Sequence, residues 1–321
     1  MEDSEASVPP RVVAVLGGNA FVPADGNLTM ARQFRFAREA LSHLQPLLGA
    51  DVQLVLGHGN GPQVGHMLAR VEQSLGEAYA LPLEVCVAES EGELGYVLLQ
   101  CLHNLLSSLG STRPVASLLT QVRVDADDPA FEQPDKPIGP VYGAARAQEL
   151  RARGFAMAED AGRGLRRVVP SPRPLEVIEA EVIDRLLSMG VIVIAAGGGG
   201  IPVVREGGAL KGVDAVVDKD LTAALLADVI GAELLVILTG VPCAYLGFGS
   251  AQQVALGRVT PAQVRAYAGE GHFPAGSMGP KMEAAASFAE RPGRRAIICD
   301  PASLPAALAG RAGTLVSGGS A

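Results

Sequence analysis

The sequence predicts an α/β protein: a three-layer αβα sandwich around one open, mostly parallel β-sheet, with a small protruding subdomain. Short apolar runs at 12–16, 52–56 and 191–196 each end in a glycine-rich loop, and helical patterns follow. Runs that are apolar on both faces are typical of the buried strands of parallel sheets. Right-handed crossovers between such strands place their loops at one edge, so we expect the three glycine loops to converge on one anion.

Composition excludes several classes of protein. The 321 residues carry a net charge of −8 and no basic run, which argues against a nucleic-acid partner. No apolar run approaches the ~18 residues of a membrane span, and the acidic start lacks a hydrophobic segment, so we expect no membrane association. The 4 cysteines are scattered and the histidines lack ligand spacing. We therefore expect reduced thiols, no metal site on the protein and a cytoplasmic location.

Strands are expected where β-branched and aliphatic residues run together, and helices where apolar residues recur at the helical period. The expected strands are 11–16, 52–56, 114–120, 191–196, 234–238, 295–299 and 313–316, and the expected helices are 30–48, one from about 64, 89–109, 144–153, 175–189, 221–227, 261–269 and 282–289. Helix 261–269 has the clearest start, since Thr260 is a good N-cap and Pro261 suits the first helical position.

The stretch from 121 to 174 differs from the rest of the chain. It is rich in Pro, Asp and Arg, and it contains Lys136 in the run Pro134-Asp135-Lys136-Pro137. A long irregular stretch inside a compact domain is typical of a lid. We therefore expect residues ~120–170 to form a mobile subdomain that brings Lys136 into a site on closure. In an unliganded structure Lys136 could then lie far from the other lysines.

We divide the chain into two lobes that face each other across a cleft. The N-terminal lobe spans 11–205 and includes the protruding subdomain, and the C-terminal lobe spans 206–317. The tails at 1–10 and 318–321 are expected to be disordered.

Lysine is rare in this chain: of 26 basic residues only four are lysines, namely Lys136, Lys211, Lys219 and Lys281. Since arginine serves elsewhere, these are candidates for positions that need a compact, flexible charge. Asp218, Lys219 and Asp220 stand before an apolar helix, where backbone N–H groups point outward. Lys211 lies outside such a motif, and we expect it to have a structural or surface role.

Glycine loops and ammonium groups together suit phosphoryl transfer, which depends on positioning and charge neutralisation. A glycine hairpin beside a solvated charge cluster is the alternative interpretation. Familiar signatures of other chemistries are missing. The chain has no Gly-Lys dipeptide and hence no P-loop, Pro62 breaks the dinucleotide fingerprint after Gly57, and no G-x-S-x-G run occurs. His58 and His66 are expected to be structural.

The order of the motifs resembles the carbamate kinase family, within the amino acid kinase fold, from Val12 to about Val316. The resemblance rests on Gly17-Gly18-Asn19-Ala20, His58–Gly65, Thr120-Gln121-Val122, Lys136–Pro140, Val169–Pro172, Gly197–Pro202, Val217–Asp220, and Gly276-Ser277-Met278 with Pro280-Lys281. Related acid kinases generally have a lysine before the first glycine pair. Here Val15-Leu16 stands in that place, and the family supplies the charge from the subdomain, at Lys136.

The resemblance implies reversible phosphoryl transfer between carbamoyl phosphate and ADP, with Mg²⁺ carried by the nucleotide, in an enzyme that we expect to be a homodimer. The implied catalytic residues are Lys136, Lys219, Lys281 and Asp218, the last holding lysine ammonium groups in place. The implied substrate-binding residues are Gly17, Gly18, Asn19, Gly59, Asn60, Gly61, Gly198 and Gly199. The nucleotide is expected over the C-terminal lobe, at Lys219, Thr239, Met278, Pro280 and Lys281.

Two positions depart from the family pattern. Glu91 stands where the family commonly has Gln, and Pro242 where an acid is frequent. Two other functions stay open: an acid kinase acting on a larger carboxylate, and a catalytically silent homologue that binds nucleotide for regulation.

Overall fold

The computed structural model describes residues 10–17, 29–74, 76–159, 164–274 and 276–318. Its main sheet has eight strands in the order β15-β17-β16-β12-β1-β2-β9-β3. Every neighbouring pair is parallel except β16 with β17. The bounds are β1 Arg11–Leu16, β2 Gln53–His58, β3 Val115–Ser117, β9 Ile192–Ile194, β12 Leu234–Leu238, β15 Arg258–Val259, β16 Arg295–Cys299 and β17 Thr314–Ser317. The predicted open, mostly parallel sheet is confirmed.

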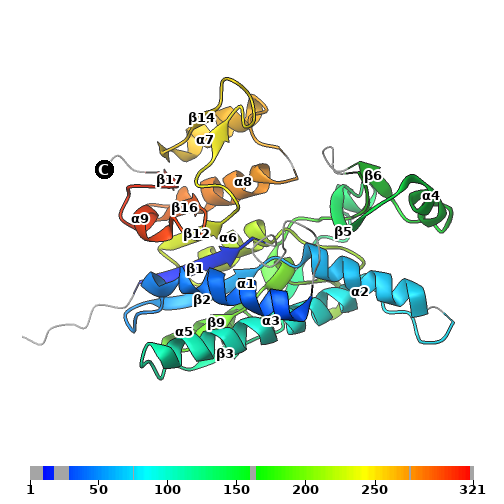
Figure 1. The fold of residues 1–321 in the computed structure, drawn as a ribbon, viewed down its shortest axis with the longest axis horizontal. Coiled ribbons are helices and arrows are strands. Elements are labelled where there is room, and N and C mark those ends of the chain that lie inside the picture. The colour runs from blue at the N-terminus through cyan, green and yellow to red at the C-terminus, as the bar shows by residue number, and fades with distance from the viewer. Residues whose placement is uncertain (1–9, 18–28, 75, 160–163, 275, 319–321) are drawn as a thin grey trace, which may run out of the picture.

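Helices cover both faces of this sheet (Figure 1). The side chains of β1 alternate between the two faces. Val12, Ala14 and Leu16 point to one face and pack against helices α1, α3 and α9. Val13 and Val15 point to the other face, toward α5, α6 and α8. The bounds are α1 Met30–Ser42, α3 Leu83–Ser108, α5 Ala180–Ser188, α6 Lys219–Val229, α8 Met278–Ala289 and α9 Leu304–Leu308. A strand apolar on both faces therefore joins two cores, as the sequence predicts.

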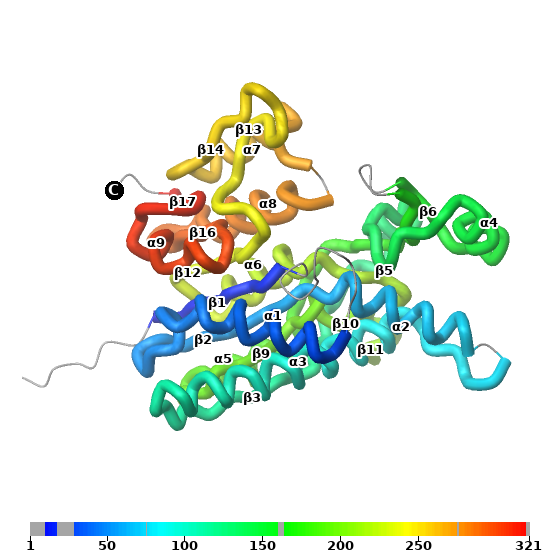
Figure 2. Tube along the Cα trace, in the orientation of Figure 1, coloured from blue at the N-terminus to red at the C-terminus, as the bar shows by residue number. Residues whose placement is uncertain are grey.

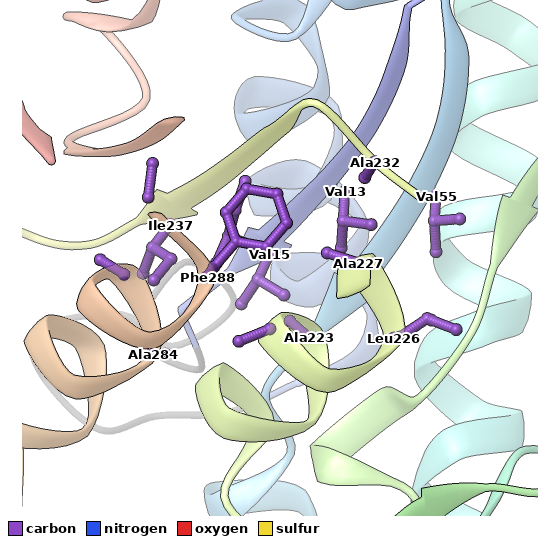
Figure 3. Close-up of a cluster of buried hydrophobic side chains, with 14 of the residues drawn as sticks. Val13, Val15, Val55, Ala223, Leu226, Ala227, Ala232, Ile237, Ala284 and Phe288 are labelled. Carbon is purple, nitrogen blue, oxygen red and sulfur yellow. The ribbon is translucent and has the colours of Figure 1, made fainter. Parts of the chain in front are cut away.

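Small side chains allow the helices to lie close to the sheet. Figure 3 shows Val13 and Val15 of β1 beside Ala223 and Ala227 of α6, with Phe288 of α8 filling the space between the layers. All of these side chains are buried. The few aromatic residues of the chain leave a core of Ala, Val, Leu and Ile, in which α6 and α8 pack against each other and against the sheet.

The region from 121 to 177 is more regular than the sequence predicts. It contains β4 Gln121–Arg123, a 3₁₀ turn Pro129–Phe131, β5 Lys136–Tyr142, α4 Ala144–Ala152, β6 Met157–Glu159, β7 Leu165–Val169 and β8 Glu176–Val177. Strands β5, β7 and β6 form an antiparallel sheet that protrudes with α4 beside helix α2, Gly61–Ser74 (Figures 1 and 2). The short polar strands are stabilised by cross-strand pairing, which periodicity does not reveal. The predicted protruding subdomain is confirmed, but the prediction that it lacks regular secondary structure is wrong.

Strands β4 and β8 belong to a four-stranded sheet with order β11-β10-β4-β8, where β10 is Ile201–Glu206 and β11 is Ala209–Gly212. This sheet was not predicted from the sequence. The lobe boundary proposed at 205/206 falls at the end of β10, inside its hairpin with β11. The division into lobes stays a prediction.

Most other elements agree with expectation, with shifts at their ends. The helix expected at 30–48 is α1 followed by a 3₁₀ turn at Gln45–Leu47, that at 175–189 begins only at Ala180, and that at 89–109 begins at Leu83. Helix α7, Pro261–Gly269, has the predicted start, with a full capping box between Thr260 and Gln263. Within the described ranges, no helix is long and apolar enough to cross a membrane.

Candidate active site

A cavity of about 410 Å³ lies at the carboxyl ends of the central strands. Gly17 follows β1, Gly59 to Gly61 follow β2, Gly198 follows β9, and Thr239 follows β12. Ligands of open α/β sheets bind beyond this edge. The three glycine loops therefore meet at one place, as predicted, although Gly18 and Asn19 lie outside the described residues.

The floor of the cavity needs glycine because other groups approach its backbone closely. A Cβ on Gly198 would lie 1.9 Å from the Asn60 side-chain nitrogen, and one on Gly199 would lie 2.4 Å from the carbonyl oxygen of Val217. Both glycines also have positive φ, 67° and 99°. Gly198 thus lets Asn60 reach the cavity. Gly199 lies beneath the surface and seats the loop against the Val217-Asp218 peptide.

Asn60 is buried and oriented by a neighbouring helix. Its side-chain nitrogen donates to Ser90 Oγ of α3 at 2.7 Å, and Ser90 Oγ donates to the carbonyl oxygen of Val87. His58 is also fully buried, and burial lowers its pKa to about 4. A neutral buried imidazole agrees with the structural role expected for this histidine.

Glu91 of α3 holds the glycine floor from below. Its Oε1 accepts the backbone N–H of Gly197 at 2.8 Å, and its Oε2 accepts that of Thr120 at 3.0 Å. Thr120 Oγ1 in turn accepts the N–H of Ala196, which has a left-handed φ of 52°. Burial raises the pKa of Glu91 to about 8, although the two N–H groups oppose this. In the sequence, Glu91 is apparent only as a departure from the family pattern, and no role was predicted for it.

Asp218 performs two tasks at the start of α6. One carboxylate oxygen caps the helix by accepting the N–H groups of Asp220 at 2.9 Å and Leu221 at 3.4 Å. The other oxygen accepts Lys136 Nζ at 3.0 Å, and the same ammonium donates to the carbonyl oxygen of Val217 at 3.2 Å. Burial opposes ionisation of Asp218, but the charges of Lys136, Lys219 and Lys281 outweigh it and hold the pKa well below its usual value.

Asp220 is the shared anchor of the other two lysines, a role that was not predicted from the sequence. Its Oδ2 accepts Lys281 Nζ at 2.7 Å and Lys219 Nζ at 2.9 Å, while the residue itself is only 1% exposed. Burial acts against the charge of Lys219, but Asp220 and Asp218 prevail and raise its pKa. Burial, with the neighbouring Lys219 charge, lowers the pKa of Lys281. The sequence feature that could have indicated this role is the second acid of the run Asp218-Lys219-Asp220.

The structure brings together all three lysines that the sequence singled out. Lys136, Lys219 and Lys281 line one cavity, so Lys136 is not distant from the other two lysines in this structure. The mobility expected for the subdomain stays a prediction. Lys281 lies in the first turn of α8, since that helix begins at Met278 and not at 282 as expected. Lys211 is exposed and pairs with Glu206, as expected for a surface residue.

The expected nucleotide positions divide into two groups. Thr239, Lys219 and Lys281 line the cavity, as do Gly240, Gly276 and Ser277. Pro280 instead lines a separate groove between α7 and α8, and Met278 packs against the apolar core. The turn of α8 that carries Lys281 inward directs Pro280 outward. Nucleotide binding at these positions stays a prediction.

The cluster has three ammonium groups and two carboxylates, which leaves it one positive charge in excess. Backbone N–H groups and an excess cation charge in a partly buried cavity attract anions. Each carboxylate is already bonded to lysine, so neither is placed to act as a general base. The arrangement suits an anionic group that is transferred without loss of a proton.

Comparison with known proteins agrees with this geometry. A model of the amino acid kinase family matches residues 10–300. A carbamate kinase from Pyrococcus horikoshii is 44% identical over 97% of this chain and 100% of its own length. This chain belongs to the carbamate kinase family. The structure of a carbamate kinase from Giardia lamblia bound to AMP-PNP, 38% identical, has a TM-score of 0.89 over 97% of this chain and 99% of that one.

Other relatives are named only as carbamate kinase-like proteins. The carbamate kinase-like protein YahI of Escherichia coli is 45% identical over 94% of this chain and 97% of its own length. The resemblance stated from the motifs and the fold that it implies are both confirmed.

Proposed function

We propose that this chain is a carbamate kinase, a phosphotransferase that moves a phosphoryl group reversibly between carbamoyl phosphate and ADP. The relatives named carbamate kinase are full-length matches. The observation that carries the proposal is the cluster of Lys136, Lys219 and Lys281, anchored by two aspartates, opposite the glycine loops of neighbouring parallel strands.

In the ATP-forming direction, the bond between phosphorus and the carbamate oxygen breaks as a β-phosphate oxygen of ADP bonds to phosphorus. The products are ATP and carbamate, which decomposes to ammonia and CO₂. The three lysines neutralise the charge on the transferring phosphoryl oxygens, which is the main protein contribution to such reactions. Neither nucleophilic oxygen carries a proton, so no general base is required.

We assign the N-terminal loops to carbamoyl phosphate and the C-terminal side to the nucleotide. The described residues that line the first side are Gly17, Gly59, Asn60, Gly61 and Gly198. The N–H groups of Gly17 and Gly59 already donate to the carbonyl oxygens of Leu238 and Leu16, so these two glycines provide space for the substrate. Thr239, Lys219 and Lys281 belong to the second side, together with the neighbouring Ser277. Gly18 and Asn19 would complete the first group by their place after β1.

The described residues fit a Mg²⁺ ion that arrives with the nucleotide. No cluster of three His, Cys, Asp or Glu side chains suited to a metal occurs within the described ranges. Asp220 Oδ1 is buried without a hydrogen-bond partner among those residues, and Asp220 lines the cavity. Mg²⁺ binds through one or two carboxylates and substrate phosphates. Asp220 would therefore face the ion, which adds positive charge next to the phosphates.

We also propose a homodimer located in the cytoplasm. The edge strand β3 is followed by the exposed Leu119, and α3 beside it exposes Tyr96. An unpaired strand edge with apolar neighbours favours association with a second copy. All 4 cysteines are free and buried, which suits a reducing compartment. Sedimentation of the purified chain would test the dimer.

The function is tested by supplying the purified chain with ADP and Mg²⁺ together with carbamoyl phosphate, acetyl phosphate or an acylated amino acid phosphate in parallel. We expect ATP to form fastest from carbamoyl phosphate. Faster formation from a larger acyl phosphate would favour an acid kinase of different specificity. Nucleotide binding without ATP from any donor would indicate a silent homologue.

A further inference from the structure

Helix α2 connects two parts of the site that are distant in sequence. It begins at Gly61, directly after Gly59 and Asn60, which line the cavity. Farther along, its flank packs against β5, the strand that begins with Lys136. The subdomain and α2 lie side by side in Figure 2. One rigid helix thus supports both a substrate loop and a catalytic lysine.

Helix α2 and strand β5 approach each other closely at two glycines. A Cβ on Gly65 would lie 1.8 Å from Gly139 Cα and 2.3 Å from its nitrogen. Neither atom belongs to a flexible side chain, so any larger residue at 65 must push the strand away. Gly139 also has a φ of 70°, which turns the backbone toward the helix. Gly139 lies three positions after Lys136 in the same strand.

A buried carboxylate makes a second contact between α2 and the subdomain, farther along the same helix. Glu72 of α2, whose side chain is 7% exposed, pairs with Arg167 of β7 at 3.5 Å and with Arg146 of α4 at 3.7 Å. Arg167 also lies over the ring of Phe155 at 4.1 Å. Since Ile138 is paired with Arg167 in the β5–β7 register, this contact lies two residues from Lys136.

Apolar packing fills the space between these two contacts. The side chains of Val64 and Met67 from α2 form one buried cluster with Ile138 of β5 and Val169 of β7. Val169 is the register partner of Lys136. The strand pair is therefore fixed on α2 at several points, all within a few residues of the lysine.

We propose that Gly65 and Glu72 are positioning residues for Lys136. They seat β5 and β7 on α2, and so fix the Lys136 ammonium relative to the Gly59–Gly61 loop at the helix start. The role of Lys136 rests on the proposed function, whereas the seating itself does not. The subdomain is then a docked part of the site, which explains why Lys136 already reaches Asp218.

The test is a double-mutant cycle on the rate of ATP formation. Gly65→Ala should lower kcat ~10²-fold, as expected for a misplacement of about 1 Å, with little change in KM for ADP. In a Lys136→Ala background, Gly65→Ala should have no further effect, because the displaced group is already absent. If the two losses multiply, Gly65 acts on the fold in general and the proposal is wrong. Gly92→Ala is the matched control, since this helical glycine is exposed and has open space around it.

Two further measurements keep the proposal testable if Gly65→Ala folds poorly or the wild type makes no ATP. Glu72→Gln should give a smaller loss of kcat, again absent in the Lys136→Ala background. Amide hydrogen exchange needs no activity. Glu72→Gln should speed exchange in β5 and β7 and leave β12 unchanged, whereas Gly92→Ala should change none of them. Unchanged exchange in β5 and β7 would overturn the seating, whatever reaction the chain catalyses.

Discussion

The two sides of the cavity hold their lysines in different ways. Lys219 and Lys281 come from helices packed on the main sheet, share the buried Asp220, and have side chains only 15% and 11% exposed. Lys136 comes from a strand outside that sheet, is 23% exposed, and bonds to Asp218 and a backbone carbonyl. The first pair is fixed by the core itself. The position of Lys136 depends on how a separate subdomain docks.

This difference shows that one cluster of charges can be held both by packing on the main sheet and by docking of a separate subdomain. Damage to Asp220 should disturb both folding and catalysis, because its removal leaves two ammonium groups in a buried place. Damage to Asp218, or to the contacts of Gly65 and Glu72 that seat the subdomain on α2, should lower the rate of catalysis and leave the main sheet stable. The predictions below test this contrast, from the largest expected effect to the smallest.

Asp220→Asn should have the largest effect. Removing one partner of a buried ion pair costs about 3–5 kcal/mol of stability. Each lysine that is no longer directed at the phosphoryl group lowers the rate by ~10²–10³-fold. We expect a lower Tm together with almost complete loss of ATP formation. Asp228→Asn is the matched control, since Asp228 also holds two cations, Arg291 and Arg294, but is more exposed and does not line the cavity. Equal effects of the two substitutions would contradict this account of Asp220.

Asp218→Asn should separate catalysis from stability. Asparagine is as good an N-cap as aspartate, so the start of α6 is retained. The negative charge that holds Lys136 is lost, and we expect a fall in kcat of ~10²-fold, the usual cost of misplacing a catalytic group, with nearly unchanged Tm. A large drop in Tm would show that the Asp218–Lys136 pair supports the fold as Asp220 does, and would remove the contrast between the two sides.

Glu91→Gln should change how stability depends on pH. Because burial raises the pKa of Glu91 from 4.5 to about 8, the folded protein keeps a proton that the unfolded chain releases. The contribution to the free energy of unfolding is therefore full below about pH 4.5 and is lost as the pH rises toward 8, at most about 1.4 kcal/mol per pH unit. Glutamine should flatten this decline in Tm. The exposed Glu89→Gln on the same helix should leave it as in the wild type.

Lys211→Arg should have the smallest effect. Lys211 is 62% exposed and pairs with Glu206 on the surface. An exposed ion pair contributes about 0–1 kcal/mol, and arginine can maintain it. The rate of ATP formation should stay within a few-fold of the wild type. A larger loss would mean that lysine scarcity marks functional positions more widely than the three in the cavity.

The sequence predicted the layers of the fold and the lysines of the site because both depend on local patterns. Apolar strands followed by glycine loops place Gly59, Gly198 and Thr239 at one sheet edge, whatever their separation in the chain. The rarity of lysine then identified Lys136 and Lys281, which come from outside those loops.

What the sequence did not predict depends on contacts between distant segments. In the sequence, Glu91 is only a departure from a motif. In the structure, the backbone N–H groups of Thr120 and Gly197, both distant in sequence, donate to its carboxylate. Asp220 looks like the second acid of a helix start until Lys281 reaches it from α8. The strands of the subdomain have no apolar alternation, since β5 contains Pro137 and Pro140 and is stabilised by pairing with β7 and docking on α2. Such partners become apparent only in the folded chain.

The most direct test of the central claim is the rate of ATP formation from carbamoyl phosphate and ADP by the wild type, Lys219→Arg and Lys281→Arg, with folding checked by Tm. Arginine keeps the charge but replaces a compact ammonium with a wide planar fork. We predict that the wild type forms ATP and that each variant is slower by ~10²–10³-fold, the cost of one misplaced donor. Near-normal rates for both folded variants would contradict the mechanism, and no ATP from the wild type would contradict the function.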